Sequence, residues 1–223
     1  MHVSFERREE LAPTIWQYYF RPVRPYDYTP GQYADFHLPE VIGDRRGASR
    51  VFTLTSIPTD SWLSFAAKFE LPMTPYKHGL QNLQPGDSVR IDDAMGDVVL
   101  PKHPSIPLVF IAGGLGIASF VSILRELERT QETRAIDLFY ARRLEADNPY
   151  KQLIERFPLK SFRSYVNPER LNVSDVLPRI TAASQVYISG SERFVENLRK
   201  ELETNGVQHE QIVFDFFDGY SEL

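Results

Sequence analysis

The stretch FIAGGLGIASF, residues 110–120, places three glycines between an apolar run and an amphipathic segment. The apolar run predicts a buried strand, and Phe120, Ile123, Leu124 and Leu127 recur at the spacing of one helical face. The glycines therefore occupy a strand-to-helix turn. Such a turn offers unpaired N–H groups and the positive end of a helix dipole to a phosphate, and glycine lets the phosphate approach the main chain. This turn predicts a dinucleotide site.

The match to the dinucleotide fingerprint G-x-G-x-x-G is incomplete. Gly114 and Gly116 occupy the first two glycine positions, but Ser119 stands in the third. A tight turn with positive φ, or close packing of the helix on the strand, would require glycine equally well. The motif alone leaves both interpretations open.

After Pro107 the sequence alternates between two patterns. Apolar runs rich in aromatic and β-branched residues predict strands at 107–114, 135–141, 162–166, 185–190 and 212–217. Helical periodicity predicts helices at 117–131, 148–157, 172–180 and 192–207. Strands that alternate with helices predict a doubly wound α/β domain with a parallel sheet.

The first hundred residues have a different rhythm. Short aromatic and β-branched runs separated by turn residues predict strands at 15–23, 31–39, 50–58, 62–70, 87–93 and 96–101, with one helical turn near 75–83. Many short strands of this kind predict an antiparallel β-barrel or sandwich, and the barrel is the expected architecture. Three prolines in residues 101–107 interrupt both rhythms. We therefore expect two domains, residues 1–103 and 104–223.

Composition excludes several classes of function. The chain has 223 residues and no cysteine, which excludes disulfides, thiolate-held zinc and a cysteine-ligated iron–sulfur cluster. The formal net charge of -5 gives no support to nucleic-acid binding. No run approaches the roughly 20 apolar residues that span a bilayer, and the N-terminal residues lack the apolar core of a signal peptide. We expect a cytoplasmic protein without a membrane span.

The second strand of the α/β half carries a further nucleotide signal. An acidic residue at its end would bind the ribose of NAD, but here Ala141 is followed by Arg142 and Arg143, with no acid before Glu145. Arginines at this position suit the 2′-phosphate of NADPH. Two ordinary solvated arginines are the alternative.

Five motifs in order resemble those of the ferredoxin–NADP reductase superfamily of flavoproteins, over nearly the whole chain. RVFTLTS (50–56) is similar to its R-x-Y-[ST] flavin signature, and TPYKHGLQNLQPGD (74–87) to the stretch under the FAD pyrophosphate. IAGGLGIASF (111–120) resembles its GGxGxTP nucleotide loop. YISGSERFVENLRKELETNGV (187–207) looks like its CGPxxM segment, and FDFFDGY (214–220) like its aromatic C-terminal strand.

On the flavin side, the resemblance implies that Arg50 binds the FAD pyrophosphate, that Phe52 lies against the isoalloxazine and that Thr53 stands near the flavin N5. It further implies FAD phosphate contacts from Thr74, Tyr76 and Lys77. Considered singly, Arg50 could be a surface arginine and Phe52 barrel core.

On the nucleotide side, the resemblance implies that the NAD(P) pyrophosphate is held by Gly113, Gly114, Gly116 and Ile117, with Arg142 and Arg143 at the 2′-phosphate. The segment that would stand near the nicotinamide consists of Ser189, Gly190 and Ser191. Phe217 and Tyr220 are the choice for the second flavin face, whereas Phe214 and Phe216 are expected in the core. The implied catalytic residues are Thr53, Ser189 and Tyr220.

The sequence departs from the superfamily pattern at several positions. Phe52 replaces the flavin-stacking tyrosine, and Ala118 and Ser119 replace the threonine and proline of the nucleotide loop. Ser189 and Ser191 replace the cysteine and proline of CGP. These changes put the efficiency of hydride transfer in question.

The expected function is that of an FAD-dependent NAD(P)H oxidoreductase, with NADPH favoured. Its electron acceptor would be a separate molecule, either a ferredoxin- or flavodoxin-type protein or a small molecule. The alternatives are a non-catalytic flavin- or nucleotide-binding module and a ferric-chelate or quinone reductase. The histidines lack metal-ligand spacing, and Asp215 and Asp218 are interpreted as exposed charges, with a proton relay as the alternative.

Overall fold

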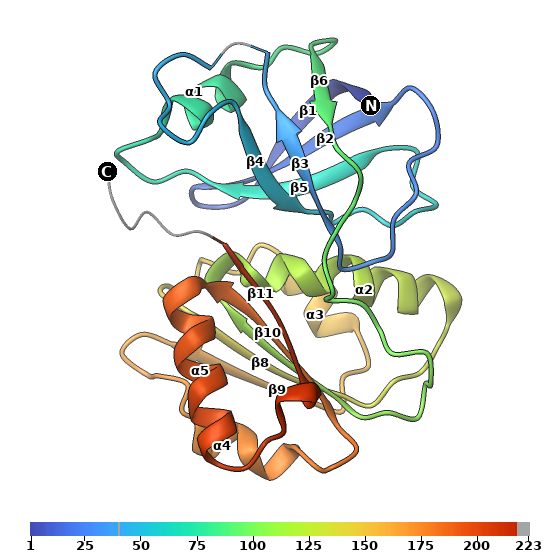
Figure 1. Ribbon diagram of the computed structural model, residues 1–223, viewed down its shortest axis with the longest axis vertical. Helices are drawn as coiled ribbons and strands as arrows, with labels where there is room; N and C mark the ends of the chain where they lie inside the picture. Colours follow the sequence, from blue (N-terminus) through green and yellow to red (C-terminus); the bar gives the residue numbers. More distant parts are fainter. Residues whose placement is uncertain (40, 218–223) are drawn as a thin grey trace.

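The computed structural model describes residues 1–39 and 41–217, except for the side chain of Phe217. In this part of the chain the strands form two separate sheets, one above the other along the long axis of the molecule (Figure 1). The last strand of the first sheet ends at Ile91, and the first strand of the second begins at Leu108. The predicted domain boundary at 103/104 lies between them and stays a prediction.

The first sheet is antiparallel and six-stranded, in the order β4-β3-β6-β1-β2-β5. Its strands are β1 (His2–Ala12), β2 (Ile15–Pro22), β3 (Tyr33–His37), β4 (Ser49–Thr53), β5 (Leu63–Lys68) and β6 (Ser88–Ile91). The sheet curls until its end strands face each other, so that Phe52 of β4 stacks on Phe65 of β5 with ring centroids 4.0 Å apart. In the described residues no ladder joins β4 to β5. The predicted barrel is thus confirmed as a barrel-like sheet that is not closed.

Inward-facing aromatic rings fill the curled sheet. Phe20, Phe36 and Phe65 are fully buried and contact one another, because alternate residues of a strand point to the same face. Helix α1 (Pro75–Asn82), at the predicted helical turn, adds Tyr76 and Leu80 to this core. Strand β1 was missed by the sequence analysis, and the strand expected at 96–101 is wrong, since only an isolated bridge from Met95 to Tyr33 forms nearby.

The second sheet is five-stranded and parallel, in the order β11-β10-β7-β8-β9. Its strands are β7 (Leu108–Gly113), β8 (Ile136–Arg142), β9 (Ser161–Val166), β10 (Gln185–Ser191) and β11 (Ile212–Phe217). The α-helices between them are α2 (Ala118–Thr130), α3 (Lys151–Arg156), α4 (Val173–Val176) and α5 (Glu192–Thr204). Short 3₁₀ turns occur at η1 (Gly114–Ile117), η2 (Leu177–Arg179) and η3 (His209–Gln211). The predicted alternation is confirmed.

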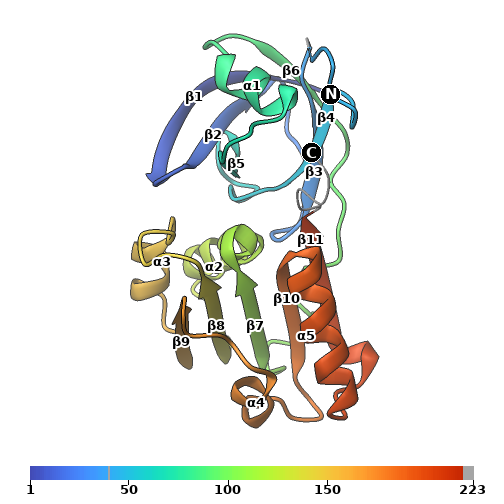
Figure 2. The same cartoon turned by 90° about the vertical axis from the view of Figure 1, so that its left-hand side faces the viewer.

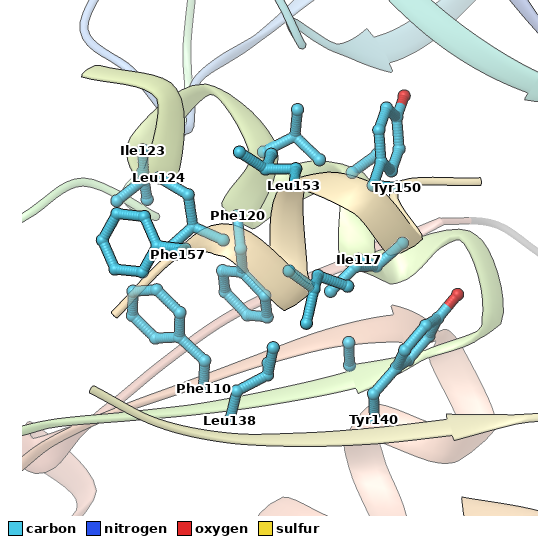
Figure 3. Close-up of a cluster of buried hydrophobic side chains, with 14 of the residues drawn as sticks. Phe110, Ile117, Phe120, Ile123, Leu124, Leu138, Tyr140, Tyr150, Leu153 and Phe157 are labelled. Atoms are coloured by element: carbon cyan, nitrogen blue, oxygen red, sulfur yellow. The ribbon is translucent and has the colours of Figure 1, made fainter. Parts of the chain in front are cut away.

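Helices cover both faces of this sheet. Phe110 of β7 packs with residues of α2 and α3, as Figure 3 shows. The adjacent Val109 and Ile111 pack on the opposite face with residues of α5. Strand β10 returns to lie beside β7 after the chain has moved out to β9, which makes the β7–β10 boundary a topological switch point. Open α/β sheets bind ligands at the carboxyl ends of such strands.

The carboxyl ends of the parallel strands point toward the first sheet (Figure 2). Buried polar contacts join the two halves: Ser122 Oγ accepts a hydrogen bond from Gly31 N–H at 2.8 Å, and Tyr150 Oη donates to Gln17 Oε1 at 3.1 Å. The Arg125 guanidinium pairs with Asp60 at 2.8 Å. These contacts fix how the switch point faces the barrel. None of the described helices is long and apolar enough to cross a membrane.

Candidate functional site

A cleft of about 1600 Å³ runs between the two sheets. Typical small-molecule pockets have volumes of about 300–1,000 Å³, so this one has room for more than one ligand group. The predicted site residues that line it are Arg50, Phe52, Thr53, Thr74, Tyr76, Lys77, Gly113, Gly114, Gly116, Arg142, Arg143, Gly190 and Ser191. The fold therefore brings the residues predicted for two different cofactors into one space.

The glycines of the 110–120 stretch have two different roles. A Cβ on Gly116 would meet the main chain at Ser189, and one on Gly113 would meet the Phe194 ring. These two glycines allow close packing inside the protein. Gly114 has φ +55° and open space where a Cβ would point. Close packing and positive φ therefore both occur in this turn, and of the three glycines Gly114 alone has no protein neighbour where a Cβ would point, so the dinucleotide site stays a prediction.

A chain of hydroxyl groups lies behind the cleft. Ser119 Oγ is 2.9 Å from Ser189 Oγ and 3.5 Å from Thr53 Oγ1, and all three residues are buried. Ser119 thus links the two predicted catalytic residues Thr53 and Ser189. Ser189 and the predicted nucleotide-binding residue Ile117 do not line the cleft, because both are buried beneath it. Any action of Ser189 on a ligand would pass through its neighbours.

On the barrel side, the predicted phosphate-binding groups already have protein partners. Arg50 Nη2 donates to Asp44 Oδ1 at 2.6 Å. The amide of Lys77 donates to Thr74 Oγ1 at 3.3 Å, which caps α1. The Lys77 ammonium donates to the Lys68 carbonyl, and burial lowers its pKa to about 8. A partly buried cation that lines a cleft would be stabilised by a bound anion.

Comparison with known proteins gives distant relatives. No family model matches the chain. It is 27% identical over 233 residues to the reductase component of propane 2-monooxygenase from Rhodococcus jostii, a match that covers 95% of this chain and 62% of that protein. It is 26% identical to flavohemoprotein B from Dictyostelium discoideum, covering 95% of this chain and 58% of that protein. The chain thus spans less than two thirds of the length of these relatives.

The fold has close counterparts among solved structures. A ferredoxin NADP⁺ reductase from Neisseria gonorrhoeae with bound FAD and NADP matches with a TM-score of 0.79 and 20% identity, covering 97% of this chain and 98% of that one. These relatives and this structure match the ferredoxin–NADP reductase superfamily that the motifs indicate. The resemblance carried by the five motifs is therefore confirmed.

The residues present fit the two cofactors of the superfamily. Gly114 gives open backbone at the switch point, as a pyrophosphate requires, and Arg50 and Lys77 place cations on the barrel side of the cleft. Phe52 stacks one face on Phe65 and also lines the cleft. The hydrogen-bond donors therefore suit anionic groups on both sides of the cleft, and Phe52 provides an aromatic surface in it.

Arg142 and Arg143, at the end of β8, differ in their environment. The Arg142 side chain is 3% exposed, and its guanidinium pairs with Glu145 at 2.7 Å and donates to Ser164. Arg142 is therefore no solvated surface residue. The Arg143 side chain is 76% exposed, and its guanidinium lies 3.9 Å from Glu70 of the other half. The sequence did not indicate that Glu145 holds Arg142.

The C-terminal strand corrects two expectations. Phe216 is 38% exposed and lines the cleft, so its assignment to the core is wrong. Phe214 is partly buried against the core, as expected, and its ring also reaches the cleft. Phe217 pairs with Ser191 through its main chain. Tyr220 and Asp218 lie outside the described residues.

Asp215 is not the exposed charge that the sequence suggested. It is half-buried and lines the cleft, and its Oδ2 is buried without a hydrogen-bond partner among the described residues. Burial raises the pKa of this carboxyl to about 6. The sequence gives no signal for this burial, because an acidic residue in the last part of an apolar strand is compatible with both an exposed and a buried side chain.

Other residues of the cleft were also missed. Phe194, whose ring packs on Gly113 and Gly190, occupies the last position of the CGPxxM-like segment. Arg170 and Arg193 line the cleft and have no ion-pair partner among the described residues. Both follow strand ends of the parallel sheet, which is the signal that could have identified them.

His37 lies in a cluster that the sequence did not indicate. Asp35, His37 and Asp92 place possible ligand atoms within 4.8 Å of one another. The Arg90 guanidinium lies within hydrogen-bond distance of both His37 ring nitrogens and pairs with Asp92 at 2.6 Å. The positive charge of Arg90 would repel a metal ion bound at this position, so we interpret the cluster as an ion-pair network.

Proposed function

We propose that the chain is an FAD-dependent NAD(P)H oxidoreductase that passes electrons to a separate acceptor. The observation that carries the proposal is the shared cleft, in which the open Gly114 turn of one half faces Arg50 and Phe52 of the other. The resemblance to the superfamily supports it, and the matches to a reductase component and a flavohemoprotein agree with it.

Bound FAD would take a hydride from NAD(P)H and release electrons to the acceptor. In this proposal Arg50, Thr74, Tyr76 and Lys77 bind the FAD phosphates and Phe52 orients the ring. The NAD(P) pyrophosphate is bound at Gly113, Gly114 and Gly116, with Gly190 and Ser191 near the nicotinamide. The buried Thr53–Ser119–Ser189 hydroxyl chain holds the floor of the cleft in place and excludes water from it.

The acceptor in this proposal is a ferredoxin- or flavodoxin-type protein, a partner protein of an oxygenase or a small molecule. The name of the relative from Rhodococcus jostii, a reductase component, supports a protein acceptor. The absence of cysteine from the chain means that no cysteine-ligated iron–sulfur cluster within these residues stands between flavin and acceptor.

The test is an anaerobic absorbance titration of the protein reconstituted with FAD. We expect a bound flavin band that NADPH or NADH bleaches. A bound flavin that neither coenzyme bleaches would favour a non-catalytic binding module. A protein that binds no flavin would contradict the proposed role of the barrel half. Turnover with ferredoxin, compared with ferric chelates and quinones, then separates the acceptor classes.

We further propose that the protein prefers NADPH to NADH and that Glu145 controls the strength of this preference. Glu145 competes with a 2′-phosphate for the Arg142 guanidinium. We expect Glu145→Gln to lower the Kd for NADP⁺ about five- to tenfold, because a charged partner is replaced by a neutral one. The Kd for NAD⁺, which has no 2′-phosphate, should not change, and calorimetry of both coenzymes measures this.

Arg142→Ala supplies the opposite arm of this experiment. It should weaken NADP⁺ binding and leave NAD⁺ binding unchanged. Equal losses for both coenzymes would mean that Arg142 only supports the end of β8 through Ser164.

A further inference from the structure

The carboxylate of Asp44 binds the same groups that an FAD phosphate would need. Asp44 Oδ1 accepts from the Arg50 guanidinium at 2.6 Å and from the Arg46 amide at 3.0 Å. Its Oδ2 accepts from the Tyr76 amide, in the first turn of α1, at 3.0 Å. The side chain is only 4% exposed. One anion therefore already bridges Arg50 and the start of α1.

Several other donors of this region also bond to the chain itself. Pro75, at the first position of α1, has no N–H, and the Lys77 amide donates to Thr74. Arg50 Nη1 donates to the carbonyls of Arg46, Gly47 and Ser49. A phosphate that binds the Arg50 Nη groups and the Tyr76 amide must take these donors over from Asp44 and its loop.

The loop around Asp44 contains two glycines. Gly43 and Gly47 flank Asp44 on either side, each with φ +79° and nothing within 4 Å of the position of a Cβ. Glycines with positive φ and open surroundings can change conformation at little steric cost. The two glycines could act as hinges that carry the carboxylate away from Arg50.

We propose that Asp44 is an internal anion that occupies the FAD phosphate site and that the pyrophosphate displaces when flavin binds. The inference rests on the proposed function. Displacement exchanges one set of charge-assisted hydrogen bonds for another at Arg50 and Tyr76, and no covalent bond changes. The apparent affinity for FAD is then reduced by the fraction of molecules in which Asp44 holds the site.

The test compares Asp44→Asn with the wild-type chain, using Asp27→Asn as the control. Asp27 is exposed, and its replacement by asparagine removes the same charge at a position away from the site. Flavin fluorescence quenching measures the Kd for FAD and for riboflavin, which has no phosphate. We expect Asp44→Asn to bind FAD about tenfold more tightly, with riboflavin affinity and the control unchanged. Weaker or unchanged FAD binding by Asp44→Asn overturns the proposal, because Asp44 would then orient Arg50.

A second measurement needs no variant. Hydrogen exchange of the wild-type protein, with and without FAD, follows the Arg46 amide and the Tyr76 amide. The Arg46 amide should exchange faster with FAD bound, while the Tyr76 amide stays protected by its new partner. Equal or slower exchange at Arg46 overturns the proposal. If wild type and variants all fail to bind FAD, the proposed function itself is wrong and this inference fails with it.

Discussion

Replacing Gly114 by Asp is expected to abolish reduction by NAD(P)H while FAD stays bound. The turn should still form, because φ is +55° and asparagine and aspartate are the residues besides glycine that tolerate this region. Open space surrounds the new side chain. Its carboxylate would face the pyrophosphate, and two like charges about 4 Å apart repel by about 4 kcal/mol near a protein surface. Coenzyme affinity should fall at least about a hundredfold.

Gly114→Asn is the matched control for this prediction. It has nearly the same shape and the same tolerance of positive φ, but no charge. We expect it to lose much less affinity than Gly114→Asp. Stopped-flow bleaching of bound FAD and calorimetry with NADP⁺ measure the two variants. If both lose affinity equally, bulk excludes the coenzyme rather than charge. If neither loses it, the phosphates do not lie at Gly114.

The parallel sheet could be predicted because its strands carry strong local signals. Strand β7 is buried on both faces and therefore reads as a continuous apolar run ending in glycines. Strand β1 gives no such signal, since after Val3 and Phe5 it continues with exposed charged residues. Strand β1 is defined by its pairing with β2 and β6, which forms only in the folded protein. Residues 96–101 have β-branched residues, but no neighbouring strand pairs with them in the described fold.

The site residues that belong to local sequence motifs could be predicted. The hydrogen-bond and ion-pair partners of these residues, which come from elsewhere in the chain, could not. The glycine turn and Arg50 lie in local motifs, and both line the cleft. The partners of the arginines were not visible. Asp44 precedes Arg50 by only six residues, yet the Tyr76 amide that completes its hydrogen bonds lies 32 residues away. Such pairings set which cations are available to a ligand, and they arise only when the fold is formed.

Replacing Asp215 by Asn is expected to stabilise the protein at pH 8 and to have no such effect at pH 4. Burial raises the folded-state pKa of this carboxyl from 3.8 to about 6. Well below pH 3.8 the group is protonated in both the folded and unfolded states, so burial adds no ionisation cost, and at pH 4 this cost is still small. As the pH rises from 3.8 to about 6, the unfolded state releases its proton while the folded state keeps it, and above pH 6 the folded protein has lost up to about 3 kcal/mol of stability. Asparagine has a similar shape and never ionises.

Thermal unfolding at the two pH values measures this difference. For a chain of this size about 3 kcal/mol corresponds to a rise of about 6–12 °C in Tm at pH 8. Asp27→Asn removes an exposed carboxylate and should change Tm little at either pH. An equal gain for Asp215→Asn at pH 4 and pH 8 would mean that asparagine improves packing or hydrogen bonding and that ionisation is not the cause. A loss at pH 8 would mean that the hydrogen bond from the Phe216 amide to the ionised carboxylate outweighs the cost of burial, although Oδ2 has no partner among the described residues.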